Sequence, residues 1–145
     1  MLSTLLRKGK TSIADMANAA LAGGVSIGAT CNVVAPDAAF GSGALAGALC
    51  VVGYVFVQPV LLARFKIVDT CGVHNLHGMP GLLGGLIAVA VVPGVATAQL
   101  VGIAVTLALA IVCGLVAGAL IRLTGTTDRA NDDAGCFCDV EPGHL

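Results

Sequence analysis

Four long apolar runs constrain this chain more than any other feature of its sequence. A helix that crosses a bilayer needs about 20 mostly apolar residues. Only 10% of the residues are charged, against about a quarter in a soluble domain. The sequence therefore predicts an all-α integral membrane protein with four transmembrane helices. The expected spans cover residues 13–34, 40–62, 69–92 and 97–123, and the turn residues Pro36-Asp37 and Pro93-Gly94 follow the first and third.

The positive charges support this number of crossings. The seven Lys and Arg residues are Arg7, Lys8, Lys10, Arg64, Lys66, Arg122 and Arg129. With four spans all of them fall on one side of the membrane, whereas three spans would put the last two opposite the others. Because cytoplasmic loops are enriched in Lys and Arg, we expect both termini to be cytoplasmic. Residues 1–12 then form a basic cytoplasmic lead, and residues 124–145 form an acidic cytoplasmic tail.

The third run is unusual because it begins with polar residues. On an α-helix His74 and His77 share a side, and Gly78, Gly81 and Gly85 continue the face of His74. In a helix bundle a histidine can simply be satisfied by a backbone carbonyl. Within a membrane span a titratable group is costly and usually faces a cavity or a partner, so we interpret His74 as a pathway residue. For His77 a packing role and a pathway role both stay open.

Two further polar residues near this start have alternative roles. Asp69 is suited to cap the third helix, because its oxygens can accept bonds from first-turn amides. Its carboxylate could also attract cations to the mouth of a pathway. Asn75 can either bond to a neighbouring helix or line the pathway. Pro80 lies inside the run and predicts a kink, and Gln58-Pro59 in the second run predicts a kink or an end.

For the polar residues that open the first span, a structural role is the first expectation. Asp15 can cap the helix, and Asn18 can bridge to another helix. Glycines four residues apart occur in all four spans, at 24/28, 43/47, 81/85 and 114/118. Small residues at this spacing allow close helix packing, so we expect a compact bundle.

We expect no metal, cofactor or nucleic acid as a ligand. Cys71, His74 and His77 lie close in sequence, but they would crowd on one kinked helix without supporting groups for a metal. Cys136 and Cys138 have no partner cluster at zinc spacing. The net charge is −1, and no basic patch is interleaved with aromatic residues, which argues against nucleic-acid binding.

Two stretches resemble motifs of one family. The run Asp69-Thr-Cys-Gly-Val-His-Asn-Leu-His-Gly-Met-Pro-Gly-Leu-Leu-Gly-Gly-Leu86 resembles the signature of the Rh branch of the ammonium transporter family (Amt/Mep/Rh). The run Asp15-Met-Ala-Asn-Ala-Ala-Leu-Ala-Gly-Gly-Val25 resembles a second family motif. The resemblance implies that the four spans are the C-terminal part of an eleven-to-twelve-helix fold. His74 then matches the second histidine of a pair that lines the pore. The first would come from a helix outside this sequence, so we expect a fragment or truncated form of a longer protein.

The resemblance also implies a function. Family members are trimeric channels that conduct ammonia derived from ammonium. The expected permeants are therefore ammonia and ammonium. The expected partners are the lipid bilayer and either a homotrimer or the missing helices, and the expected location is the plasma membrane. The implied mechanism is deprotonation near the mouth, passage of ammonia past the histidines and reprotonation; there is no covalent chemistry, so we do not expect an enzyme. The alternative is a non-conducting membrane interaction protein that modulates a full-length relative.

Overall fold

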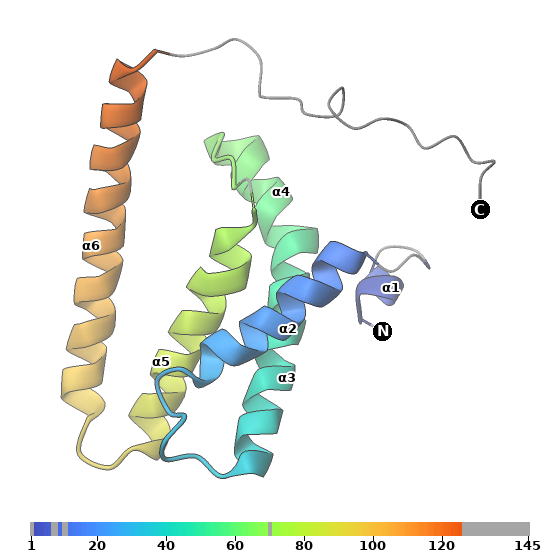
Figure 1. Cartoon of the computed structure of the whole chain (residues 1–145), viewed down its shortest axis with the longest axis vertical. Coiled ribbons are helices and arrows are strands. Elements are labelled where there is room, and N and C mark those ends of the chain that lie inside the picture. The colour runs from blue at the N-terminus through green and yellow to red at the C-terminus, as the bar shows by residue number, and fades with distance from the viewer. Residues whose placement is uncertain (1, 7–8, 10–11, 70, 126–145) are drawn as a thin grey trace, which may run out of the picture. The chain divides into compact units, whose positions relative to one another are not determined.

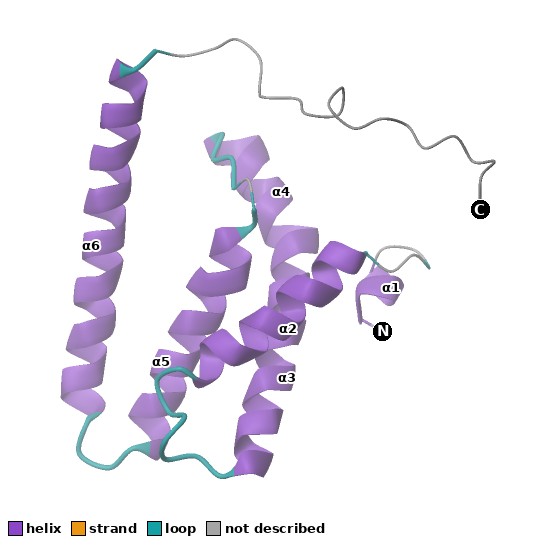
Figure 2. Cartoon of the chain, viewed as in Figure 1, coloured by secondary structure: helices purple, strands orange, loops and turns teal. Residues whose placement is uncertain are grey.

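The computed structural model describes residues 2–6, 9, 12–69 and 71–125. All regular structure in these residues is helical, as the sequence predicts, and Figure 2 shows the helices joined by short loops. The chain divides into two compact units, and the boundary between them, at Leu107 and Ala108, falls within the last helix. The helices are α1 (Leu2–Leu6), α2 (Ile13–Ile27), α3 (Pro36–Val52), α4 (Gln58–Val60), α5 (Met79–Val91) and α6 (Ala96–Leu123), and the π-helical segments are η1 (Gly53–Val57), η2 (Leu61–Phe65) and η3 (His74–Gly78).

Helix α2 begins where the first apolar run begins but ends earlier than that run. The run predicts a helix to residue 34, yet the helix ends at Ile27. Beyond it, backbone N–H groups bond to the carbonyl three residues back. Thr30 donates to Ile27 at 2.9 Å, and Val33 donates to Thr30 at 3.0 Å. These tighter turns replace the α-helical pattern, and the chain then enters α3.

The second helical rod runs without interruption from Pro36 to Phe65 and consists of α3, η1, α4 and η2. It does not end at Pro59. The Gln58 N–H bonds to the Gly53 carbonyl, which is one residue further back than in an α-helix. A proline ring clashes with the carbonyl four residues before it, and the wider π-helical turn gives that ring room. The rod ends at Lys66, whose φ of 56° is left-handed.

The third helical segment combines η3 and α5, and it begins at His74 rather than near residue 69. The expected kink at Pro80 takes the form of a π-helical turn, in which the Met79 N–H bonds to the His74 carbonyl. In both proline-containing helices the π-helical segment therefore ends at the second residue before the proline.

Small residues bring α2 close to α3 and α5, and Figure 1 shows α2 crossing these two helices. A Cβ atom built on Gly23 would lie 3.3 Å from the Gly43 carbonyl oxygen of α3. A Cβ atom on Gly84 of α5 would collide with the Ser26 carbonyl oxygen of α2. Such close approach leaves no room for side chains at the crossings, so backbone packs on backbone.

Only some of the glycine pairs take part in this packing. Gly43 and Gly47 both face α2, and a Cβ on Gly47 would lie 3.0 Å from the Ala19 carbonyl oxygen. Gly24 of α2, by contrast, has nothing within 4 Å of a built Cβ atom. The four-residue spacing therefore marks a helix contact in the second rod.

Two helices are long and apolar enough to cross a membrane by length and composition, namely Pro36–Phe65 and Ala96–Leu123. Helix α2 is apolar but has only 15 residues. The third segment begins with the polar side chains of His74, Asn75 and His77, which lower its mean hydropathy. Two of the four predicted spans therefore pass this test within the described residues.

Candidate functional site

The third helical segment exposes its two histidines. His74 and His77 are both exposed, whereas Asn75 and Leu76 between them are buried. The buried side of η3 packs against α2 and α3. Packing therefore fixes one side of the segment and leaves the histidines on a surface that the described residues do not cover.

The His74 side chain lies over Gly78. A Cβ atom on Gly78 would be 3.2 Å from His74 Nδ1, which is closer than ordinary van der Waals contact. A π-helical turn contains more residues than an α-helical turn. The side of the helix that carries a given residue is therefore shared more nearly by the residue four positions later than by the residue three positions later. Gly78 rather than His77 is thus the neighbour that leaves room for the His74 imidazole.

Asp69 holds the start of this helix. Its Oδ1 accepts a hydrogen bond from the Val73 N–H at 2.8 Å, and its Oδ2 accepts one from the His74 N–H at 3.0 Å. The first N–H groups of a helix have no partner within it, and a carboxylate there also complements the positive end of the helix dipole. Asp69 therefore caps the helix and holds the His74 backbone directly.

Gln58 of α4 connects the second rod to this helix start. Its Nε2 donates to the Asp69 carbonyl at 2.9 Å, and its Oε1 accepts from Asn75 Nδ2 at 3.2 Å. In the sequence, Gln58 entered only the prediction of a kink or an end at Gln58-Pro59. A polar amide inside an apolar run was the available sign that this side chain has partners.

Asn75 is fully buried, so the structure places it between helices. A Cβ atom on Gly53 of η1 would collide with Asn75 Oδ1, so glycine at position 53 makes space for the amide. In the described residues Oδ1 has no hydrogen-bond partner. Of the two roles left open by the sequence, this position favours the bond to a neighbouring helix.

Tyr54 forms a second connection, which the sequence did not predict. Its hydroxyl accepts from Asn18 Nδ2 at 2.8 Å and donates to the Cys71 carbonyl at 2.8 Å. Gly72 packs directly against the Tyr54 hydroxyl and has a φ of +66°. Tyr54 was the one tyrosine of the sequence, and its position inside an apolar run was the only available signal.

The two polar residues at the start of α2 have different structural roles. Ser12, not Asp15, provides the N-cap, because the Ser12 side chain accepts from the Asp15 N–H at 3.2 Å. Asp15 lies in the first turn, where a negative charge complements the helix dipole, and it is 3% exposed. Asn18 reaches across to the second rod through Tyr54.

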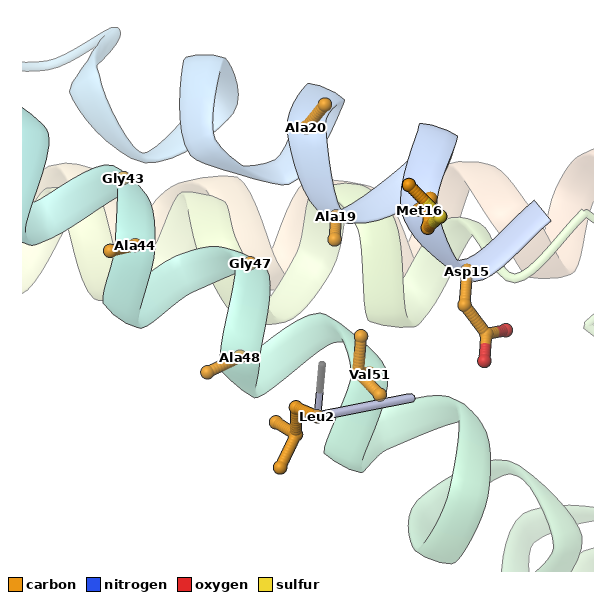
Figure 3. Close-up of a pocket in the computed structure, with 10 residues that line it drawn as sticks. All are labelled: Leu2, Asp15, Met16, Ala19, Ala20, Gly43, Ala44, Gly47, Ala48 and Val51. Atoms are coloured by element: carbon orange, nitrogen blue, oxygen red, sulfur yellow. The ribbon is translucent and has the colours of Figure 1, made fainter. Parts of the chain in front are cut away.

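A separate pocket of about 380 Å³ lies along α2 and α3 (Figure 3). Small side chains dominate its wall, with Asp15 at one end, and neither His74 nor His77 lines it. It is therefore distinct from the surface that carries His74. The lining residues are Leu2, Asp15, Met16, Ala19, Ala20, Gly43, Ala44, Gly47, Ala48 and Val51.

Among the described residues, no group of three or more His, Cys, Asp or Glu side chains is arranged to hold a metal ion. Cys136 and Cys138 lie outside the described part of the chain, as does most of the acidic tail. The site is therefore built from histidine, amide, hydroxyl and carboxylate groups around one helix start.

Comparison with known proteins identifies the family. The model of the Ammonium Transporter Family matches residues 1–135. The chain is 40% identical to the ammonium transporter Rh type B of Xenopus tropicalis over 92% of its own length, and 37% identical to the Rh type A protein of Bos taurus over 94%. It covers only 34% and 33% of those two proteins, so it spans about a third of their length.

A solved structure is similar over nearly the whole chain. The Rh50 protein of Nitrosomonas europaea, described as a channel of the Rhesus family, is 61% identical with a TM-score of 0.87. The similarity covers 96% of this chain and 37% of Rh50. All these matches are to transporters and channels rather than to enzymes. The chain belongs to the ammonium transporter family, in its Rh branch.

Proposed function

We propose that this chain forms one wall of an Rh-type pore for ammonia and ammonium, in which His74 is a pathway residue. The observation that carries the proposal is the exposure of His74 and His77 on a helix whose opposite side is anchored in the fold. Titratable groups are costly within a membrane and usually face a cavity or a partner. An open histidine surface on a chain similar to the Rh50 channel therefore fits a pore wall.

The chemistry of imidazole suits this permeant. A neutral imidazole offers one hydrogen-bond donor and one acceptor, so His74 can pass ammonia along without trapping it. It can also accept a proton from ammonium. Deprotonation near the mouth, passage along the histidines and reprotonation on the far side together move ammonia across the bilayer. Asp69 contributes by holding the His74 backbone at 3.0 Å.

The facing wall comes from helices outside this chain. The chain spans about a third of its relatives, and the histidine surface is open in the described residues. We infer that further helices, in a longer polypeptide or in a partner, cover this surface, and that the assembly is a trimer in the plasma membrane.

Four crossings with cytoplasmic termini complete the proposal. Arg64 and Lys66 lie at the end of the second rod, and Arg122 lies near the end of α6. Because Lys and Arg are enriched on the cytoplasmic side, we place both helix ends there, which requires an even number of crossings between them. Helix α2 and the third segment cross as members of a bundle rather than as isolated spans, because α2 packs closely on α3 and α5.

The test is a chimera in which this whole chain replaces the matching segment of Nitrosomonas europaea Rh50. The purified chimera is placed in liposomes that contain a pH-sensitive dye, and the alkalinisation rate is recorded after a jump in ammonium concentration. His74→Ala should lower the rate at least tenfold towards that of empty liposomes. Val73→Ala changes an exposed apolar neighbour and serves as the matched control, with a rate within twofold of the parent.

An unchanged rate in the His74→Ala chimera would overturn the pore role. The alternative function, a non-conducting modulator, makes a different prediction. In that case the unmodified chain, co-expressed with intact Rh50, would change the ammonia flux through Rh50. The His74→Ala variant of the chain, co-expressed in the same way, would change this flux by the same amount.

A further inference from the structure

We propose that Gln58 and Tyr54 are positioning residues for His74. They tie Asp69 and Cys71, which lie in the connection before η3, to the second helical rod and thereby set the place of the helix start that carries the histidine. This inference rests on the proposed function, because position matters here only if His74 lines a pathway.

Gln58 acts from both ends of its amide. Its Nε2 binds the Asp69 carbonyl at 2.9 Å, and its Oε1 binds Asn75 Nδ2 at 3.2 Å. Asp69 in turn binds the His74 N–H through Oδ2 at 3.0 Å. Gln58 therefore holds the residue that caps His74 and also the side chain next to His74 in sequence.

Tyr54 acts similarly at the next part of the connection. The hydroxyl binds the Cys71 carbonyl at 2.8 Å and is itself held by Asn18 of α2 at 2.8 Å. The second rod carries this oxygen and α2 binds it through Asn18, so two helices fix its position. Because Gly72 lies directly against it, the hydroxyl also limits how close the backbone can come to the rod.

These ties matter because the His74 ring has little else to hold it. The side chain is exposed, and within the described residues the ring makes no hydrogen bond. The described residues between Lys66 and Val73 contain no helix. The position of the imidazole is therefore set by the backbone before His74, where the second rod holds the Asp69 carbonyl through Gln58 and the Cys71 carbonyl through Tyr54.

The experiment uses the Rh50 chimera with two conservative variants, Tyr54→Phe and Gln58→Met. Each removes hydrogen bonds while keeping most of the side-chain volume. Phe56→Leu is the matched control, because Phe56 lies in η1 beside Tyr54 but is 53% exposed. The half-saturating ammonium concentration and the maximal alkalinisation rate are measured separately, and amide hydrogen exchange is followed at residues 73–76 and in α3.

In each variant we expect the amide hydrogens of residues 73–76 to exchange about fivefold faster, while those of α3 exchange at the parental rate. A change of about fivefold corresponds to the loss of a hydrogen bond of ordinary strength. We expect the maximal rate to fall about fivefold and the half-saturating concentration to change less than twofold. Adding Asn18→Ala to Tyr54→Phe should change the rate little further, because Asn18 acts through the hydroxyl.

Three results would overturn the inference. The first is exchange at residues 73–76 that stays unchanged in both variants. The second is exchange that rises equally throughout α3, which would mean a general loss of stability. The third is parental flux in both variants although His74→Ala abolishes flux. Failure of the proposed function is a separate result, because it would leave flux unchanged in His74→Ala whatever the exchange shows.

Discussion

Gly72 shows how much one residue contributes to the start of the third helical segment. Its φ of +66° is unfavourable for any side chain, and the Tyr54 hydroxyl occupies the place of a Cβ. We expect Gly72→Ala to lower the free energy of unfolding by about 2–4 kcal/mol, from left-handed strain and overpacking together. Thermal unfolding of the purified protein in detergent measures this loss.

Gly24→Ala is the matched control for that change. Gly24 lies inside α2 and has nothing within 4 Å of a built Cβ. Alanine is the better helix former there by about 1 kcal/mol in water, so the protein should become no less stable. Equal losses for the two variants would show that Gly72 has no special role.

Gly78 governs the His74 side chain itself. A Cβ at 3.2 Å from Nδ1 forces the exposed ring to move by a few tenths of an ångström. Because the ring is exposed and free to shift, Gly78→Ala should change stability by less than about 1 kcal/mol. It should nevertheless slow ammonia flux in the Rh50 chimera severalfold. A parental flux would mean that conduction tolerates a displaced imidazole.

Among the helices, Gly84 of α5 lies against the backbone of α2 with no room for a side chain. A Cβ on Gly84 would collide with the Ser26 carbonyl, and neither backbone can yield easily. We expect Gly84→Ala to cost about 1–3 kcal/mol through overpacking. Gly81→Ala is the comparison, because its Cβ would meet only Val25 Cγ1, at 3.8 Å. Thermal unfolding in detergent should separate the two alanine variants clearly.

The sequence predicts the helices of this fold better than it predicts their ends and interiors. Apolar runs gave the second rod and α6, but not the end of α2 at Ile27, because bonds to the third residue back leave no mark in an apolar pattern. Pro59 and Pro80 indicated a disturbance in each helix. Its form, a π-helical turn, depends on backbone bonds that the sequence does not display.

The same limit applies to the site. His74 and Asp69 could be proposed as site residues because charged and titratable groups stand out in or beside apolar runs. The partners of Tyr54 and Gln58 lie 11 to 36 residues away, so only the folded chain brings them together. Asn75 stood out as a polar residue with two open roles, but its burial and its bond to Gln58 required the structure.

For the molecule as a whole, the crossing number leads to a labelling prediction. With four spans, Ala35 and Lys66 lie on opposite sides of the membrane, and both are exposed. In a cysteine-free background, Ala35→Cys should react with an impermeant maleimide added outside intact cells, whereas Lys66→Cys should react only after permeabilisation. Labelling of both positions from one side would exclude the proposed topology.

The polar start of the third segment has a consequence for biogenesis. A translocon releases a nascent helix into lipid according to the apolarity of that helix. Helix α6 is long and apolar enough to cross a membrane by its length and composition, so it can partition into lipid by itself. The segment that begins at His74 cannot do so as readily. Gly85 lies against Ile103 and Gln99 of α6, so we expect α6, although synthesised later, to assist the insertion of the histidine-bearing helix before it.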